Sequence, residues 1–511
     1  MDKSHRIAYN TIALYANMMV TLLVTLLGTR FVLEALGKQE YALYTLLMSA
    51  VLMLSFVNVA MANATQRYLS FSMGSNDLVQ VREIFYNSTV IHFLIALVLG
   101  LLLVGLGVPA VRYWLDIPLE LHGKAMIVLF CMIISVVCTV VAVPFEATMN
   151  AHEDIFVIAG ISALEAVCKL FSAIIVLFLD NHQLIIYSLL MSSASMVGYL
   201  CKRIYSRRHY EESHYVWHKV NDFQLIRNMV GFAGWNLIGV GCSMARYQGT
   251  AILLNKFFGL LLNAGYGVAQ QVNSFLLFFA NSAVRPMRPH IVKCEGAGEH
   301  QQMVKLANST SRITSLMLSM AIVPLYINMP FVLEIWLKEV PNGALEFCRG
   351  FLVVTFVGQL SIGLQIALES VGRIRRQHLI LGIMHILPIP MAYMLFRHGY
   401  PYIYIMYCII VEEIIGLFVR AYITKKDAVF PLKSFTFGHV VPCLMCVALS
   451  FAFAAYVAEL CEYGWPRLLV STVSSTFLLT IFSYLFCLTN WEKEKIQSLF
   501  SAIVLKLKGN S

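Results

Sequence analysis

The chain has 511 residues, of which 59% are hydrophobic and 13% are charged, and its formal net charge is +9. Because soluble globular proteins carry about 25% charged residues, this composition excludes an ordinary soluble domain and indicates a chain that lies within a bilayer. Most of the 12 cysteines fall inside apolar stretches, and only Cys461 falls clearly in an outer loop, so we expect no disulfide framework.

Apolar stretches fill nearly the whole chain. A helix needs about 20 apolar residues to cross a bilayer core, and about 14 stretches of this kind follow one another. They leave no loop large enough for a separate catalytic domain, so we expect the function to take place inside or across the membrane. The predicted spans are 10–33, 41–62, 85–108, 123–145, 155–179, 184–200, 229–252, 259–281, 313–333, 345–370, 378–396, 402–424, 437–459 and 467–488. Span 184–200 is short, and Pro388 and Pro390 interrupt span 378–396.

Lysine and arginine are concentrated in every second connection between the predicted spans. The outer connections hold Lys38, Arg112, Lys256, Lys338 and Arg397, and the inner segments hold most of the others. By the positive-inside rule, this asymmetry predicts a multi-pass protein with both termini in the cytoplasm. The basic residues then face lipid headgroups, so membrane lipids rather than nucleic acid are the expected phosphate partners.

The longest inner connection, 201–228, separates the first six predicted spans from the last eight. The pattern A-N-x-x-x-R recurs at 62–67 and 280–285, at the same inner edge six spans apart, which favours two related halves with a substrate path between them. The predicted parts are an N-terminal six-helix lobe (1–205), a basic cytoplasmic linker (206–228), a C-terminal six-helix lobe (229–424), an extra helix pair (425–488) and an amphipathic cytoplasmic tail (489–511).

Polar side chains recur at helical spacing in the eighth predicted span. A polar side chain that faces lipid is costly, so the polar face of a span should contact protein or water. The stripe consists of Asn263, Tyr266, Gln270, Asn273 and Asn281, with Gln271 beside it. Interhelical hydrogen bonding and a water-filled substrate cavity both account for this stripe, and we favour the cavity.

The seventh predicted span carries Asn236, Ser243, Arg246 and Thr250 on one face. No acidic residue lies within one turn of Arg246, so its guanidinium needs a more distant carboxylate, water or an anionic ligand. Guanidinium groups match phosphate oxygens in shape and charge, which makes Arg246 the first candidate for a phosphate contact. A distant ion pair is the alternative.

Spans one and two repeat this polar character. Asn17 and Thr21 share a face of span one, and Asn58 lies on the polar face of span two. Arg30 is about half a turn away from the face of span one, and Glu34, four residues later, is a simple local partner for it. The equivalent spans of the two halves therefore both present polar faces, which we predict to line the cavity.

Two further charge groups lie near the middle of predicted spans. Glu165 and Lys169 are four residues apart on span five, where they either neutralise each other or take part in ion coupling. Glu412 and Glu413 lie on span twelve, with Arg420 two turns away, and both a structural pair and a proton-carrying carboxylate fit this pattern. Motifs for metal, nucleotide or catalytic sites do not occur, so we predict no cofactor, no metal site and no catalytic residue.

With six plus six plus two spans and polar faces on spans one, two, seven and eight, the chain resembles the multidrug/oligosaccharidyl-lipid/polysaccharide (MOP) exporter superfamily. Local sequences resemble those of its polysaccharide branch. These are Asn10-Thr11, Thr29-Arg30 and Leu36-Gly37 in the first stretch, Phe232-Ala233-Gly234-Trp235-Asn236 at the entry of span seven, and Tyr266-Gly267-Val268-Ala269-Gln270-Gln271 in span eight.

The resemblance implies an all-α polytopic fold with two MATE-like six-helix lobes. It also implies a Wzx-type flippase in the biosynthesis of lipopolysaccharide O-antigen or another surface polysaccharide. Such a protein lies in the bacterial cytoplasmic (inner) membrane and works beside other polysaccharide assembly proteins. It moves undecaprenyl-pyrophosphate-linked oligosaccharide to the outer leaflet by alternating access. Cationic cavity residues meet the pyrophosphate in that branch, and Arg246 and Arg30 are the matching candidates here.

Two other functions stay open at this point. A multidrug exporter of the same superfamily, coupled to Na⁺ or H⁺, would need a mid-membrane acid such as Glu165, Glu412 or Glu413. A membrane glycosyltransferase or polymerase would need a carboxylate-rich outer loop. The outer loops hold only scattered acids without a D-x-D motif, which disfavours the enzyme.

Overall fold

The computed structural model describes residues 55–114, 119–214, 223–337, 340–495 and 497, together with separate positions between 17 and 48. All regular elements in this part of the chain are helices, and it contains no strand, as the composition predicts. The chain divides into two compact units. One is Ala8–Leu237, and the other is Ile238–Ser511 with Met1–Ile7. We call them the N-terminal and the C-terminal unit and describe each by itself.

Within the described residues, 8 helices are long and apolar enough to cross a membrane, or up to 9 if one bent pair counts as a single span. Four further helices are long but more polar: α2 (Ser55–Gly74), α7 (Phe223–Phe258), α8 (Leu260–Val284) and α15 (Tyr404–Asp427). Their polar stripes and charges lower their mean hydropathy. Most of the predicted span 10–33 lies outside the described residues, so the total of about 14 spans stays a prediction.

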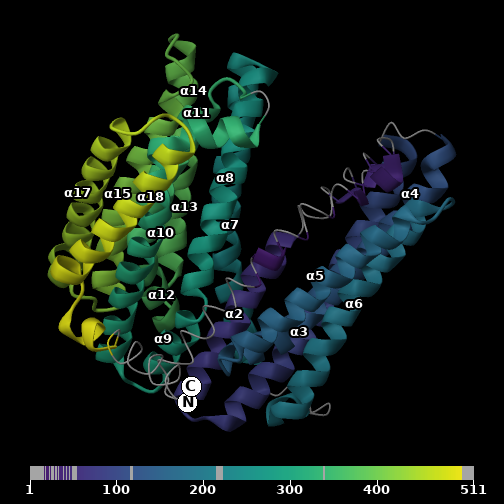
Figure 1. Ribbon diagram of the computed structural model, residues 1–511. Helices are drawn as coiled ribbons and strands as arrows, with labels where there is room; N and C mark the ends of the chain where they lie inside the picture. Colours follow the sequence, from purple (N-terminus) through teal and green to yellow (C-terminus); the bar gives the residue numbers. More distant parts are fainter. Residues whose placement is uncertain are drawn as a thin grey trace, which may run out of the picture. The chain divides into compact units, whose positions relative to one another are not determined.

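The N-terminal unit is a helix bundle centred on α4 (His122–Ala151). This helix packs against α2, against α3 (Leu78–Pro109) and against α6 (Gln183–His209), while α5 (Ile155–Leu177) packs on α6 (Figure 1). The first turn of α3 is capped by Asp77, whose carboxylate accepts a hydrogen bond from the Gln80 amide at 3.0 Å. Short helical turns follow α3, precede α4 and follow α6, at Ala110–Trp114, Leu119–Leu121 and Glu211–His214.

The C-terminal unit is built around α10 (His300–Trp336) and α11 (Ala344–Leu360). Its largest apolar core runs through both helices, and α11 packs against α8 and α15. The other helices are α9 (Met287–Gly296), α12 (Ile362–Val371), α13 (Arg375–Ile386), α14 (Pro388–Arg397), α16 (Leu432–Phe435), α17 (Val441–Glu459) and α18 (Trp465–Phe482). Figure 1 shows α17 and α18 in yellow beside α10, and both helices contact it.

One span of the C-terminal unit is bent, and others contain local irregularities. The predicted span 345–370 consists of α11 and α12, which meet at Ser361 with a bend of 43°. The two prolines predicted to interrupt span 378–396 lie at the start of α14, directly after α13. Two π-helical segments, η4 (Thr436–Val440) and η5 (Ser483–Cys487), lie at the start of α17 and the end of α18. Segments of this kind are frequent at functional sites.

Several helices extend beyond the spans predicted for them. Span 41–62 was expected to end at residue 62, but α2 continues to Gly74, and α6 is 27 residues long where a short span was expected. Helices α6 and α7 also take up both ends of the predicted inner connection 201–228. Hydropathy marks only the part of a helix that fits hydrocarbon, whereas backbone hydrogen bonds let the helix continue into polar sequence.

The contact between α12 and α10 gives a test of this packing. A Cβ atom added at Gly363 would lie 1.9 Å from the carbonyl oxygen of Ala307, a backbone atom that cannot move aside. We expect Gly363→Ala to lower the stability of the purified protein by about 1–3 kcal/mol, because overpacking forces the two helices apart. Thermal unfolding in detergent measures this. Gly267→Ala is the matched control, since nothing lies within 4 Å of its Cβ position. Equal melting temperatures for the two variants would contradict the packing.

Candidate functional site

Buried charged side chains from α7, α13 and α15 meet inside the C-terminal unit. Arg246 of α7 donates through Nη1 to Glu412 at 2.6 Å and to Glu413 at 3.2 Å, both on α15. The exposed fractions of Arg246, Glu412 and Glu413 are 5%, 6% and 8%. One guanidinium therefore holds two adjacent carboxylates away from solvent, and the distant ion pair considered for Arg246 is present in the structure.

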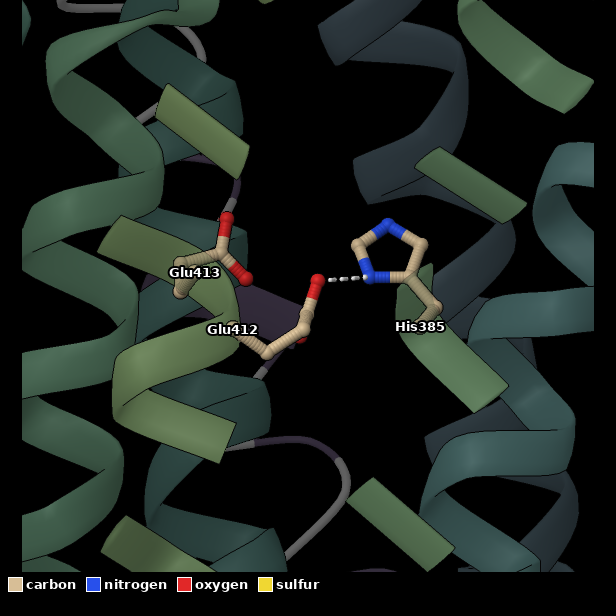
Figure 2. Close-up of side chains that lie close together, drawn as sticks. All are labelled: His385, Glu412 and Glu413. Carbon is tan, nitrogen blue, oxygen red and sulfur yellow. Dashed lines mark ion pairs between the residues drawn. The ribbon is translucent and has the colours of Figure 1, made fainter. Parts of the chain in front are cut away.

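His385 of α13 extends this group. Figure 2 shows its ring pointing toward the Glu412 carboxylate, with Glu413 beside it. Its Nδ1 lies 3.0 Å from Glu412 Oε1, close enough for an ion pair when the ring is protonated. Neither of these two atoms has a hydrogen-bond partner, so the contact is near but not aligned.

Arg420, two turns after Glu413 on α15, joins the group to the break between α11 and α12. Its Nη1 donates to the hydroxyl of Ser361, which lies at the break. Both Arg420 and Ser361 are buried. We call Arg246, His385, Glu412, Glu413 and Arg420 the charge cluster. Its two guanidinium groups and two carboxylates balance, and the imidazole is a fifth ionisable group that can add a charge.

Ligand atoms of His385, Glu412 and Glu413 lie within 4.8 Å of one another, a spacing that suits a cation. Arg246, however, already contacts both carboxylates. A metal ion or Na⁺ would therefore have to displace the guanidinium, while a proton could neutralise one carboxylate without needing that space. The arrangement therefore suits carboxylates that exchange Arg246 for a proton better than it suits permanent binding of a metal.

The polar stripe of α8 makes interhelical hydrogen bonds. Asn273 accepts a hydrogen bond from Thr355 of α11 at 2.7 Å and donates to the Tyr247 hydroxyl at 3.4 Å. Tyr266 donates to the Tyr247 carbonyl at 3.3 Å. Both stripe residues are buried, whereas Gln271 is exposed. The buried stripe residues Tyr266 and Asn273 therefore fit the alternative interpretation, in which the stripe makes hydrogen bonds between helices.

Other predicted cavity residues are spread over both units. Asn263, Gln270 and Ser243 are half-buried in the C-terminal unit, and Asn236 is buried in the N-terminal unit. Asn17 and Thr21 are helical and half-buried. Arg30 lies outside the described residues, and for Asn58 only the helical backbone is described. A common cavity for these residues therefore stays a prediction.

The two predicted groups for ion coupling differ. Lys169 donates to Glu165 at 2.7 Å within α5, so these charges neutralise each other as their spacing suggests. They belong to the N-terminal unit, whereas Glu412 and Glu413 belong to the C-terminal unit. Because Glu412 and Glu413 share one guanidinium, the second group has the greater capacity to change partners.

Sequence reasoning missed three residues of interest. His385 lies inside a predicted span, and an ionisable side chain there is itself a signal. Ser361 carries no such signal, because its role comes from a helix break. Arg67 ends the first A-N-x-x-x-R pattern, and its guanidinium lies over the rings of Tyr68 and Phe232 at 4.7 and 5.4 Å. Such stacking holds a guanidinium in one orientation.

Several solved structures share this arrangement of helices. A point mutant of a MATE protein has a TM-score of 0.71 at 13% identity, covering 85% of this chain and 98% of that one. A MOP superfamily transporter from Pyrococcus furiosus Vc1, described as having a binding pocket of reverse polarity that suggests a different function, has a TM-score of 0.70 at 12% identity, with 85% and 97% covered.

An outward-facing multidrug resistance MATE family transporter of the MOP superfamily has a TM-score of 0.69 at 13% identity, covering 85% of this chain and 97% of that one. No family model matches the chain, and no curated protein matches it in sequence. The chain thus has the multi-pass helical fold of MATE transporters, and these structural neighbours are transporters and not enzymes.

The charge cluster predicts an asymmetric response to mutation. Arg246→Met leaves two carboxylates buried without their cation, which we expect to lower stability by about 3–5 kcal/mol. Adding Glu412→Gln removes one of the two charges and should restore part of that loss. Thermal unfolding of the purified variants measures both effects. Arg376→Met is the control, because Arg376 is nearly half exposed in its pair with Asp427 and such pairs contribute little. An unchanged melting temperature for Arg246→Met would contradict the cluster.

Proposed function

We propose that the protein is a membrane transporter that flips lipid-linked oligosaccharide from the inner to the outer leaflet. Its fold, shared with MOP superfamily transporters, supports transport in general. The observation that carries the finer proposal is Arg246, a cation inside a membrane unit whose two partners are carboxylates that can be replaced. The sequence resemblance to the polysaccharide branch supplies the substrate class.

Flipping requires no bond chemistry, but it must move a charged and hydroxyl-rich headgroup through hydrocarbon. An unsatisfied polar or charged group in that environment costs at least several kcal/mol. Polar side chains along the path replace the hydrogen bonds of water, while the lipid tail stays in the bilayer. In transporters built from two repeats, rocking of one half against the other opens such a path to each side in turn.

In this proposal Arg246 exchanges its carboxylates for a pyrophosphate. A guanidinium binds phosphate oxygens through two parallel hydrogen bonds, much as it binds carboxylate. Protonation of Glu412 or Glu413 removes one competing charge, and His385, 3.0 Å from Glu412, is placed to deliver that proton. Release of the guanidinium and binding of the anionic headgroup then become one coupled event, which gives the cluster a role in both ion coupling and substrate binding.

A reconstituted flipping assay tests this proposal. Vesicles containing undecaprenyl-pyrophosphate-linked oligosaccharide are treated with an external lectin, and the protein should change the fraction of headgroups that the lectin reaches. Arg246→Lys keeps the positive charge but loses the planar guanidinium that donates two parallel hydrogen bonds. We expect this variant to flip the substrate at least about tenfold more slowly, since a hydrogen bond to a charged group contributes about 1.5–3 kcal/mol. Arg376→Lys serves as the control. Full export in cells by a folded Arg246→Ala variant would remove the proposed role of Arg246.

A cation-coupled multidrug exporter is the second candidate, and Glu412 and Glu413 favour it equally as coupling groups. Drug accumulation in cells separates the two functions. If the protein lowers drug accumulation but moves no oligosaccharide headgroup in vesicles, the exporter replaces the flippase. If it moves the headgroup and leaves drug accumulation unchanged, the flippase stands.

Thiol labelling tests which face of α8 meets water. We expect a cysteine at Gln271, which is exposed, to react with a membrane-impermeant maleimide in intact cells or inverted vesicles. A cysteine at Asn273, which bonds to Thr355 and Tyr247, should stay unreactive. Both variants are made in a background whose native cysteines are replaced. An unreactive 271 from both sides of the membrane would show that the exposed face meets lipid, and the polar path would then not run along α8.

A further inference from the structure

The segment after the last span begins with a capping box. The Thr489 amide donates to the Glu492 carboxylate at 2.8 Å, and the Glu492 amide donates to the Thr489 hydroxyl at 3.4 Å. This reciprocal pair satisfies backbone donors at the start of a helix. The described turn, 489–495, is therefore an ordered helix start at the inner end of α18, and its sequence specifies it locally.

The same carboxylate is buried against α10. Arg312 donates through Nη1 to Glu492 at 2.5 Å, and the exposed fractions of these residues are 4% and 3%. Burial alone would raise the pKa of Glu492, but the charge of Arg312 and the hydrogen bonds from Thr489 outweigh burial and hold that pKa below its usual value. Beside this pair, the ammonium of Lys305 lies 4.4 Å from the centre of the Trp491 ring. The turn is thus docked by one buried and one peripheral contact.

Arg312 has a second partner that leads toward the charge cluster. Its Nη2 donates at 2.7 Å to the carbonyl of Gly438, which lies in the π-helical segment η4. The next residue, His439, contacts the Leu360 carbonyl through Nε2 at 2.9 Å. Leu360 is the last residue of α11, directly before the break at Ser361. In a membrane span the backbone groups at such a break need partners from neighbouring helices.

From these contacts we infer that residues 489–495 act as a latch that positions the α11–α12 break. Docked Glu492 holds Arg312 against η4, and η4 presents His439 to Leu360. The break in turn presents the Ser361 hydroxyl to Arg420, which belongs to the charge cluster. Glu492 is therefore a positioning residue, which acts on the cluster through a chain of buried contacts. The effect on transport rests on the proposed function, whereas the latch itself does not.

The energetics of a buried pair make the latch a two-position device. An intact buried ion pair adds little net stability, because desolvation offsets most of the attraction. Removing one partner, in contrast, leaves an uncompensated charge that draws water or local unfolding. The turn is consequently either docked with its carboxylate paired or released with Glu492 in solvent, which leaves Arg312 without its counter-charge, and intermediate positions are disfavoured.

Native cysteines report on the latch. Cys443, Cys446 and Cys487 are buried, with 3.3 Å between the sulfurs of Cys443 and Cys487. Cys487 also contacts Cys446, and Cys443 contacts His439. Cys348 is buried in α11, away from this contact, and serves as the internal control. Labelling with N-ethylmaleimide followed by peptide mass spectrometry measures each cysteine separately in the purified full-length protein.

We expect Glu492→Ala to speed labelling of the three cysteines by at least about tenfold through local opening, while Cys348 reacts as in the unchanged protein. Glu492→Gln, which keeps the shape and the capping hydrogen bonds, should give a smaller increase and covers the case in which the alanine variant does not fold. Arg312→Lys keeps the positive charge but loses the second hydrogen bond, to the Gly438 carbonyl, so it should loosen η4 while the turn stays docked. Lys305→Ala removes only the peripheral contact and should change little.

The latch is overturned if folded Glu492 variants label at the unchanged rate, or if Cys348 gains reactivity to the same degree, because that would indicate general destabilisation. Flipping assays on the same variants then test the link to transport, where a loss of rate parallel to the labelling supports it and an unchanged rate refutes it. Labelling needs no substrate. If the unchanged protein flips nothing while the labelling pattern holds, the proposed function fails and the latch remains.

Discussion

The compensation of charge in a low-dielectric interior organises the C-terminal unit. An isolated ion in hydrocarbon is costly, so a charged side chain placed there needs a partner, and the partners in the charge cluster come from other helices. Arg246 fixes α7 against α15, and Arg420 fixes α15 against the α11–α12 break. Apolar packing alone would allow these helices many sliding positions, whereas paired charges select a few. The positions of the broken helix and of the polar helices follow from this constraint.

The helical fold could be predicted from the sequence because hydropathy and helix formation have the same origin in a bilayer, where each segment must satisfy its own backbone. Interruptions were harder to predict. The prolines at 388 and 390 mark one helix junction directly, because proline lacks a donor. The break at Ser361 has no such mark. It is stabilised by Arg420 and His439 from distant parts of the chain, and tertiary partners of this kind leave no local pattern.

The same distinction separates the site residues that could be predicted from those that could not. Glu165 and Lys169 are four residues apart on one helix, so their pairing follows from helix geometry. Arg246 and Glu412 are separated by 166 positions, and the sequence showed only that each needed a partner. For α8, helical phase groups the polar residues on one face of the helix, but phase cannot say whether that face meets water or another helix. Asn273 meets Thr355.

Buried ion pairs are a poor choice for stability alone, since apolar side chains of similar volume hold helices as well or better. Ion pairs instead allow exchange of partners, because a proton can neutralise the carboxylate and an anionic ligand can take its place beside the guanidinium. Two buried pairs are Arg246 with Glu412 and Arg312 with Glu492. Contacts lead from the second pair through the α11–α12 break to Arg420, whose charge interacts with Glu412 and Glu413. A change of partner at either pair leaves a charge that the next contact must accommodate. A perturbation can thus pass along the unit as a series of partner changes. Continuous apolar packing would instead absorb the same perturbation by small shifts.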